Sequence, residues 1–150
     1  MKNVLIIGGG VSGVTTAIVL ASEKVKVTLM EGNDKLLKKL LITGNGRCNF
    51  YNEDQSFKHY HSTHQELLQQ FLTEENPLHA LNFIENLGIV PLVKNGYYYP
   101  FTNKASTVYE AFLERLSKTN VKVLLNHKVK DIELRNNGFL LTMNFILMLF

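Results

Sequence analysis

The sequence predicts an α/β fold with a parallel sheet, and three observations near its start support that prediction. A short apolar run rich in β-branched residues, Val4–Ile7, is bounded by glycine, which is typical of a buried strand. A glycine-rich turn follows and opens the segment Val11–Ala21, which has the composition of a helix. A second apolar run, Val25–Met30, ends at the acidic residue Glu31. Strand, helix and strand in this order predict parallel pairing of the two strands.

The glycines of the first turn have the G-x-G-x-x-G spacing of dinucleotide-binding proteins. Gly8 permits a tight turn, Gly10 lacks the Cβ that would block a pyrophosphate, and Gly13 lets the helix approach the strand. The helix N-terminus adds free N–H groups and the positive end of its dipole. Glu31 follows at about the 20-residue distance where a carboxylate accepts the adenosine ribose hydroxyls and repels a 2′-phosphate. The pattern therefore favours a Rossmann-like domain that binds an adenine dinucleotide other than NADP. A coincidental glycine turn in another α/β fold is the alternative.

Length and composition fit a globular domain, with 150 residues, 45% hydrophobic and 19% charged residues. The net charge of +3 is mild, and no basic stripe with interleaved aromatic residues indicates a nucleic-acid partner. We expect no secretory signal and no membrane span, because no apolar run has the required length and flanks. The single cysteine, Cys48, cannot form an intrachain disulfide, which favours a reducing cytoplasm.

A second glycine loop, Thr43–Asn49, follows a basic segment that contains Lys35, Lys38 and Lys39. Such a loop offers closely spaced backbone N–H donors, and the Arg47 guanidinium can bind an anion with two hydrogen bonds. From these residues alone, a surface turn beside a solvated run of charges is the alternative.

The combination of GGGVSG, Glu31 and KKLLITGNGRCN resembles the BaiN-like flavoproteins, a bacterial family of FAD-dependent oxidoreductases. Some members of that family are called aminoacetone oxidases and others dehydro-bile-acid reductases. The stretch NGYYYPFTNKASTVYEAFLERL, Asn95 to Leu116, is similar to the family's G-x-x-F-P-x-[ST]-x-K-A segment. The resemblance implies an incomplete FAD-binding domain of the glutathione-reductase-like Rossmann type, with a β-hairpin insertion.

The resemblance also implies where FAD is held, although it names no catalytic residue. The resemblance implies that Gly8, Gly10, Ser12 and Gly13 bind the pyrophosphate, that Glu31 binds the adenosine ribose, and that Lys38 and Lys39 lie on the phosphate side. It also implies that Gly44, Gly46, Arg47 and Asn49 approach the flavin half and that the backbone of Val129 lies beside the adenine.

The chain departs from the family pattern at three places. Leu37 stands where the family usually has glycine, and Phe50 replaces a small hydroxyl residue. The turn Ser22–Lys24 lacks its usual glycine. Leu37 matters most for the loop, because a bulky side chain restricts a backbone position where glycine is expected.

The remaining segments predict further helices, a hairpin and strands. The pattern places a capping box at Thr63 and Glu66 and a helix from Pro77 to Gly88, with Leu78, Leu81, Ile84 and Leu87 inward. A hairpin turn is expected at Asn95–Gly96 and a helix over 106–118. A strand over 121–125 is expected to pair with the first strand, and a further strand with Val129, Ile132 and Leu134 is expected to turn back at Asn137–Gly138. His59, His61 and His64 predict no metal site, because no cysteine or carboxylate completes a ligand set.

These observations lead to one preferred function and two alternatives. We expect residues 1–142 to be the N-terminal part of an FAD-binding domain and residues 143–150 to be an apolar tail outside the family resemblance. The chain then belongs to an FAD-dependent oxidoreductase of a small-molecule substrate, and by itself we expect it to be inactive. The alternatives are a non-catalytic fragment without a retained cofactor and a stand-alone NAD-binding module.

Overall fold

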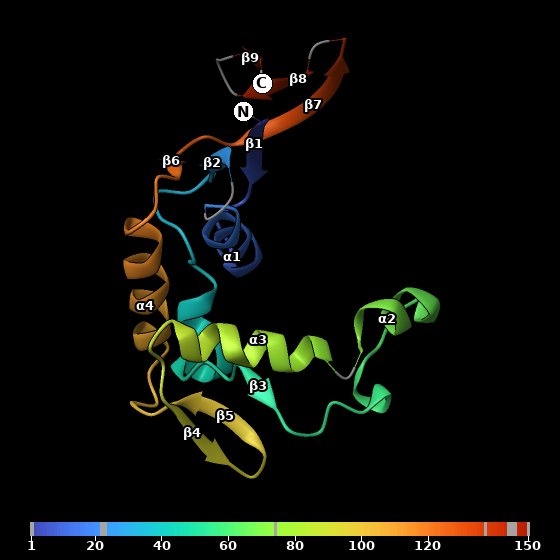
Figure 1. The fold of residues 1–150 in the computed structure, drawn as a ribbon, viewed down its shortest axis with the longest axis vertical. Coiled ribbons are helices and arrows are strands. Elements are labelled where there is room, and N and C mark those ends of the chain that lie inside the picture. Colours follow the sequence, from blue (N-terminus) through green and yellow to red (C-terminus); the bar gives the residue numbers. More distant parts are fainter. Residues whose placement is uncertain (1, 22–23, 74, 137, 144–146, 150) are drawn as a thin grey trace. The chain divides into compact units, whose positions relative to one another are not determined.

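A computed structural model describes residues 2–21, 24–73, 75–136, 138–143 and 147–149 (Figure 1). The chain divides into two compact units. The first unit consists of Met1–Leu40 and Phe112–Phe150, and the second of Leu41–Ala111. Among the described residues, no helix has the length and apolar character needed to cross a membrane.

The first unit contains the predicted parallel sheet, with strand order β1-β2-β6. Helix α1 connects β1 to β2 and packs on both strands. The elements are β1 (Lys2–Ile7), α1 (Val11–Leu20), β2 (Val25–Met30) and β6 (Lys122–Leu124). The pairing of β1 with β2 is parallel, from Lys2 opposite Val25 to Ile7 opposite Met30. The predicted fold class and the strand–helix–strand unit are confirmed.

The core of this sheet lies on its central strand, β2. Val27, Leu29 and Met30 are buried, as expected for a parallel strand covered on both faces. Helix α1 contributes Val14 and Ala17, which are three residues apart and so share one helical face. The apolar run of β2 and the apolar stripe of α1 thus form one packed layer.

Strand β6 corrects the predicted pairing. It pairs in parallel with β2, from Thr28 opposite Lys122 to Met30 opposite Leu124, and not with the first strand. A buried apolar run fits beside either neighbour, so its composition does not specify its partner. Because β2 is buried along most of its length, it needs a strand on each side, and β6 supplies the second.

A second sheet in the first unit is antiparallel, with order β7-β8-β9. Its strands are β7 (Val129–Arg135), β8 (Gly138–Met143) and β9 (Leu147–Leu149). The strand predicted after Val129 is confirmed, whereas the turn residue Asn137 lies outside the described residues. Leu141 and Met143 are buried, and Ile132 and Leu134 are exposed.

The second unit contains a small antiparallel sheet of order β3-β5-β4 together with helices α2 and α3, 3₁₀ turns and the first part of α4 (Ala105–Ser117). These elements include β3 (Tyr51–Asn52), the 3₁₀ helix Phe57–His59, α2 (Gln65–Phe71), α3 (Glu75–Asn86), β4 (Pro91–Lys94) and β5 (Tyr97–Pro100). The hairpin between β4 and β5 turns at Asn95 and Gly96, with φ angles of 52° and 78°. Two positive φ angles define a type I′ turn, and the hairpin predicted at the Asn-Gly pair is confirmed.

The predicted start of helix α2 is wrong. The helix begins at Gln65 after His64, and the backbone N–H of His64 donates to Ser62 Oγ over 3.0 Å. Ser62 therefore orders the turn before the helix, whereas the capping-box pattern placed that role on Thr63. The spacing of a hydroxyl and an acidic residue fits several registers, and the local turn selects among them.

Helix α3 begins at Glu75 rather than at Pro77. Pro77 is tolerated in the first turn, where the backbone N–H groups have no partner within the helix. Leu78, predicted to point inward, is 52% exposed. Gly88 has φ +89° just beyond the helix, so the predicted glycine stop is confirmed.

Helix α4 (Ala105–Ser117) passes from the second unit into the first. Val108, Phe112 and Leu116 are buried and four residues apart, so they form the predicted apolar face. The expected helix over 106–118 is therefore confirmed to within one residue at each end.

Candidate dinucleotide site

The turn between β1 and α1 requires glycine for two separate steric reasons. Gly8 has φ +107°, and its N–H donates to the carbonyl oxygen of Met30 over 2.7 Å. A Cβ added at Gly13 would lie 1.9 Å from the carbonyl oxygen of Gly8. Such a contact is impossible without moving the backbone, so the sequence prediction that Gly13 lets the helix approach the strand closely is confirmed.

The start of α1 leaves space for a ligand. Apart from Gly10 itself, its two chain neighbours and the backbone of its own helix, no described protein atom lies within 4 Å of a Cβ built on Gly10. Gly10 is the N-cap of α1, and no side chain caps this helix start among the described residues. The first N–H groups of a helix attract an anion when no side chain satisfies them. Ser12 lies in the first turn of this helix, and its carbonyl accepts a hydrogen bond from Thr16 Oγ1.

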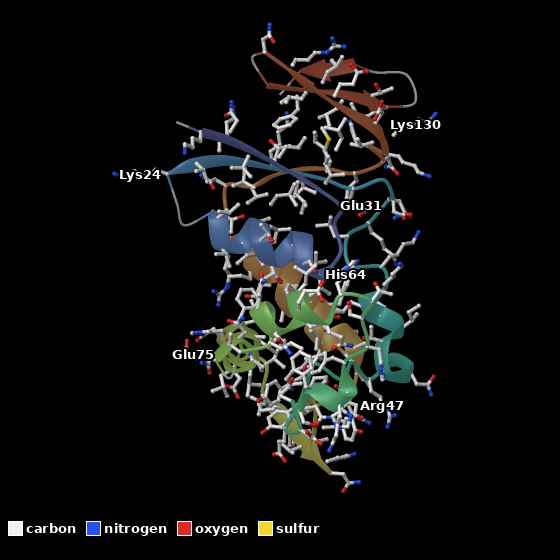
Figure 2. All side chains as sticks on the ribbon, turned by 90° about the vertical axis from the view of Figure 1, so that its right-hand side faces the viewer. Lys24, Glu31, Arg47, His64, Glu75 and Lys130 are labelled. Atoms are coloured by element: carbon white, nitrogen blue, oxygen red, sulfur yellow. The ribbon has the colours of Figure 1, made fainter. Side chains whose placement is uncertain are left out.

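Glu31 lies where β2 ends (Figure 2) and is held by three hydrogen bonds. Its Oε2 accepts from the Gly9 N–H over 2.7 Å. Its Oε1 accepts from the Asn33 backbone N–H over 2.8 Å and from Asn33 Nδ2 over 2.6 Å. We call this arrangement the Glu31 clamp. It links the glycine turn to the segment after β2.

The clamp holds Glu31 in its ionised form. Burial raises the pKa of this carboxyl, but the hydrogen bonds, chiefly those from Asn33 and Gly9, outweigh burial, so the pKa is lowered from its usual value. The site therefore presents a negative charge beside the glycine turn near neutral pH. That charge suits ribose hydroxyls as hydrogen-bond donors and opposes a 2′-phosphate.

Sequence reasoning missed Gly9, the middle glycine of GGG. A Cβ added there would lie 2.3 Å from Leu36 Cδ2 and 3.1 Å from Glu31 Cβ. Gly9 is thus required by the approach of Glu31 and Leu36, which are distant in the sequence. The run of three consecutive glycines was the available signal, since the G-x-G-x-x-G spacing explains only the first and third.

Two cavities in the first unit adjoin Glu31 and Asn33. One has a volume of 290 Å³ and is lined by Gly8, Gly32, His127, Lys128 and Val129 among others. The second has a volume of 250 Å³ and is lined by Gly9, Gly10, Lys35, Leu37, Lys38 and Lys39 among others. Both cavities are lined in part by Glu31. The other residues implied by the resemblance that line one or the other cavity are Gly8, Gly10, Lys38, Lys39 and Val129. Lys38 is also paired with Asp34 over 3.1 Å in an exposed ion pair.

Leu37 adopts the backbone conformation that the family pattern assigns to glycine. Its φ is +56°, its side chain is 1% exposed, and its N–H donates to the Gly9 carbonyl over 2.7 Å. A left-handed conformation costs a non-glycine residue about 1–2 kcal/mol. Burial of a leucine side chain contributes about 1.5–3 kcal/mol, which offsets that strain. The departure at Leu37 therefore leaves the loop geometry intact.

The second glycine loop lies in the second unit. Within Leu40–Gly46, Thr43 is extended, and Gly44 and Asn45 are left-handed, with φ values of 53° and 56°. These three residues form a kink between two short 3₁₀ turns. Arg47 Nε donates to the Gly44 carbonyl over 3.2 Å, and its guanidinium lies 5.3 Å from the centre of the Tyr99 ring. The guanidinium is thus oriented by a carbonyl and a cation–π contact.

Cys48 and Asn49 complete this loop. Cys48 is buried with φ +59°, and burial raises the pKa of its thiol despite a hydrogen bond from the Thr43 side chain. Asn49 Nδ2 is buried and has no hydrogen-bond partner within the described part of the chain. The four residues expected on the flavin side, Gly44, Gly46, Arg47 and Asn49, thus lie in one short loop.

The histidine run does not form a cluster of ligands. His59 Nε2 lies 2.8 Å from Asp54 Oδ2, and His64 Nδ1 lies 3.4 Å from Glu66 Oε1. Across the described ranges, no group of three or more His, Cys, Asp or Glu residues could hold a metal ion.

The parallel sheet, the glycine turn and the acidic residue after β2 define a Rossmann-type dinucleotide-binding domain. Residues 2–145 match the family described as the HI0933-like protein Rossmann domain, and the chain belongs to this family. The family resemblance drawn from GGGVSG, Glu31 and TGNGRCN is confirmed.

Two curated relatives extend this comparison. The chain is 33% identical over 143 residues to the 3-dehydro-bile acid delta(4,6)-reductase of Clostridium scindens, covering 94% of this chain and 35% of the relative. It is 26% identical over 129 residues to the ribosomal RNA dihydrouridine synthase of Haemophilus influenzae, covering 86% and 32%. The chain thus spans about a third of the length of these relatives.

Solved structures share the fold at low sequence identity. A 3-ketosteroid-delta4-(5alpha)-dehydrogenase from Rhodococcus jostii has a TM-score of 0.65 at 11% identity, covering 97% of this chain and 43% of that one. THI4 of Thermovibrio ammonificans has a TM-score of 0.63 at 14% identity, covering 95% and 48%. CtdE, solved in complex with FAD and a substrate, has a TM-score of 0.56 at 16% identity, covering 99% and 35%.

Proposed function

We propose that this chain binds FAD and supplies the dinucleotide-binding part of an FAD-dependent oxidoreductase. The observation that carries the proposal is the ionised Glu31 carboxylate, fixed beside a helix start with open space at Gly10. Family membership and the FAD complex of a protein with the same fold support the choice of cofactor.

The residues around Glu31 fit the ADP half of FAD. Two ribose hydroxyls are donors, and the clamped carboxylate retains acceptor capacity, because two oxygens offer about four sites. The pyrophosphate is an anion, which suits a helix start without a side-chain cap and an adjoining cavity lined by three lysines. In this proposal Gly8, Gly10, Ser12 and Gly13 hold the pyrophosphate, Glu31 binds the ribose, Lys38 and Lys39 lie on the phosphate side, and the backbone of Val129 lies beside the adenine.

In this proposal the second glycine loop binds the flavin half of FAD. Gly44, Gly46, Arg47 and Asn49 approach it through backbone and side-chain contacts, and Arg47 adds a positive charge held by Gly44 and Tyr99. A bound flavin supplies the hydride chemistry, while the protein contributes binding, orientation and electrostatics. In this proposal the residues of this chain bind and orient the cofactor, and no catalytic residue is assigned to it.

We extend the proposal to the organisation of the chain. Residues 1–142 form the N-terminal part of the FAD-binding domain. The apolar residues 143–150 begin with the last residue of β8, and Leu147–Leu149 among them pair with β8 as strand β9. The two curated relatives are named for different substrates, a bile acid and a ribosomal RNA, and neither substrate is assigned to this chain. By itself, the chain is expected to bind the ADP half of FAD and to turn over no substrate.

A competition titration tests the cofactor proposal. The purified chain is titrated with FAD, and FMN, NAD and ADP are tested as competitors. We expect ADP to compete with FAD and FMN to compete poorly, because FMN lacks the adenosine that Glu31 binds. Glu31→Ala should weaken FAD binding by one to two powers of ten, the size of one hydrogen bond to a charged group.

Glu110→Gln serves as the control, because Glu110 is an exposed carboxyl on α4 outside both cavities. NAD binding tighter than FAD binding would favour the stand-alone NAD module. Failure of both to bind would favour a fragment without a cofactor.

A further inference from the structure

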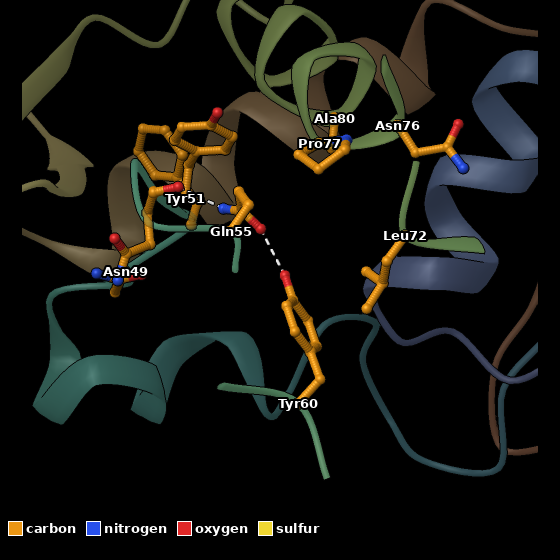
Figure 3. Close-up of a pocket in the computed structure, with 10 residues that line it drawn as sticks. Asn49, Tyr51, Gln55, Tyr60, Leu72, Asn76, Pro77 and Ala80 are labelled. Atoms are coloured by element: carbon orange, nitrogen blue, oxygen red, sulfur yellow. Dashed lines mark hydrogen bonds between the residues drawn. The ribbon is translucent and has the colours of Figure 1, made fainter. Parts of the chain in front are cut away.

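A third cavity lies entirely within the second unit and has a volume of 390 Å³. Pockets for small molecules have volumes of about 300–1,000 Å³. Figure 3 shows Asn49 and Tyr51 on one side of this cavity and Leu72 and Asn76 on the other. The cavity shares Asn49 with the loop that we propose approaches the flavin, and a substrate of a flavoenzyme has to reach the flavin.

The lining of this cavity is uncharged. Among the described residues that line it, none is acidic or basic. Aromatic rings come from Phe50, Tyr51 and Tyr60, and the Tyr51 ring is fixed edge-on against Tyr98, with 5.0 Å between ring centres. A charged group loses hydration in such a site without gaining a counter-charge. Rings and amides therefore favour an uncharged ligand with a ring system.

Among the described residues that line the cavity, one buried donor has no hydrogen-bond partner. The Tyr60 hydroxyl donates to Gln55 Oε1 over 2.5 Å, and Gln55 Nε2 donates to the Asn52 carbonyl, as the dashed lines in Figure 3 show. Both ends of Gln55 are thus occupied. Asn49 Nδ2 is buried without a partner in the described residues. A buried donor without an acceptor costs about 1–3 kcal/mol, so a ligand oxygen that accepts from it would be favoured.

We propose that this cavity binds an uncharged ring compound with a carbonyl oxygen, whose rings contact Phe50, Tyr51 and Tyr60 and whose oxygen accepts from Asn49 Nδ2. The binding assignment stands on the second unit alone. Its role as the substrate site rests on the proposed function, since only a bound flavin would make the compound a substrate.

Three probes that share one ring system separate the contributions of ligand charge and of the carbonyl oxygen to binding. The chain is titrated with 2-acetonaphthone, which is uncharged and has a carbonyl; with 2-naphthoate, which is an anion; and with 2-ethylnaphthalene, which has no acceptor. We expect the ketone to bind at least about tenfold more tightly than the anion, because the lining offers no positive charge. Asn49→Ala should weaken ketone binding about threefold to tenfold, the size of one neutral hydrogen bond, and leave 2-ethylnaphthalene binding unchanged.

Two further variants guard this test against a folding defect. Phe50→Ala should weaken all three probes, because it removes a ring from the lining. Tyr97→Ala removes an exposed ring from the neighbouring strand β5, outside the cavity, and should change none. Far-UV circular dichroism checks that each variant is folded. If Asn49→Ala is not folded, the binding of the three probes to Phe50→Ala becomes the test of the proposal.

Several results would overturn the proposal: absence of saturable ketone binding, equal binding of the anion, or an unchanged ketone affinity in Asn49→Ala. Displacement of the ketone by more tightly bound lumiflavin would assign the cavity to the flavin ring instead. FAD affinity is measured on the same preparation by itself, so failure of the cofactor proposal is distinguished from failure of the cavity.

Discussion

Replacing Glu31 with glutamine tests the Glu31 clamp directly. The carboxylate accepts three N–H donors through its two oxygens. A glutamine side chain has one acceptor oxygen, and its NH₂ group is a donor. If the oxygen stays with the two Asn33 donors, the NH₂ group faces the Gly9 N–H, and that hydrogen bond is lost.

The magnitude follows from the number of lost contacts. A hydrogen bond to a charged group contributes about 1.5–3 kcal/mol. Because Glu31 is partly exposed, solvent screening reduces the expected loss to about 1–2 kcal/mol. For a chain of this length, 1 kcal/mol corresponds to about 2–4 °C in Tm. Glu31→Gln should therefore lower Tm by roughly 2–8 °C, measured by circular dichroism at pH 7 without added cofactor.

The same variant has a defined pH dependence. The clamp lowers the pKa of Glu31 in the folded chain below its ordinary value of 4.5. The stabilisation is thus fully present well above pH 4.5 and is lost as the pH falls through the lower, folded pKa. The Tm difference between wild type and Glu31→Gln should shrink in that acidic range. The control variant Glu110→Gln should leave the Tm at pH 7 unchanged. A Tm unchanged by Glu31→Gln at pH 7, or a difference that does not shrink as the pH falls below 4.5, would refute the role assigned to the clamp.

Three further predictions concern the two glycine loops and Leu37, which lies between them in the sequence. Gly10→Ala should keep the wild-type Tm but weaken FAD binding at least about tenfold. Gly13→Ala should lower both the Tm and the FAD affinity, because its Cβ would lie 1.9 Å from the Gly8 carbonyl oxygen. Equal Tm values for the two variants would contradict this steric assignment. Leu37→Gly should lower the free energy of unfolding by about 1–2 kcal/mol in urea titrations, since the lost burial exceeds the relieved strain, and a stabilised variant would show that strain dominates. The buried Cys48 thiol, with its raised pKa, should react with a disulfide reagent at pH 8 much more slowly in the native chain than in urea, and equal rates would place it at the surface.

Sequence reasoning succeeded where the determinants are local. The bounds of β2, the helix after the glycine turn and the Asn95–Gly96 hairpin follow from apolar runs and from residues that permit positive φ angles. It failed where a choice depends on distant residues. The partner of β6 is set by the need of β2 for a second neighbour, and no pattern within β6 encodes that need.

The candidate site shows the same division. The spacing of the glycines and of Glu31 identified the kind of site, because the fingerprint itself is a set of spacings. The role of Gly9 as a donor to Glu31 was not predictable, since that contact joins residues 22 positions apart that no local pattern relates. Asn33, the other donor, lies only two residues after Glu31. Leu37 carries the opposite lesson, because a buried leucine took the left-handed conformation expected only of glycine.

The first glycine turn is more rigid than its composition suggests. Three glycines in a row have the largest conformational freedom in the unfolded chain, yet here the Gly8 N–H is bonded to Met30, the Gly9 N–H to Glu31, and the Gly9 carbonyl to the Leu37 N–H. The entropy of this turn is therefore lost when the chain folds, and little remains to be lost when a dinucleotide arrives. In the ligand-free chain, the amide protons of Gly8, Gly9 and Leu37 should accordingly exchange with solvent as slowly as those of the sheet, and the dinucleotide should meet a turn that already has its bound shape.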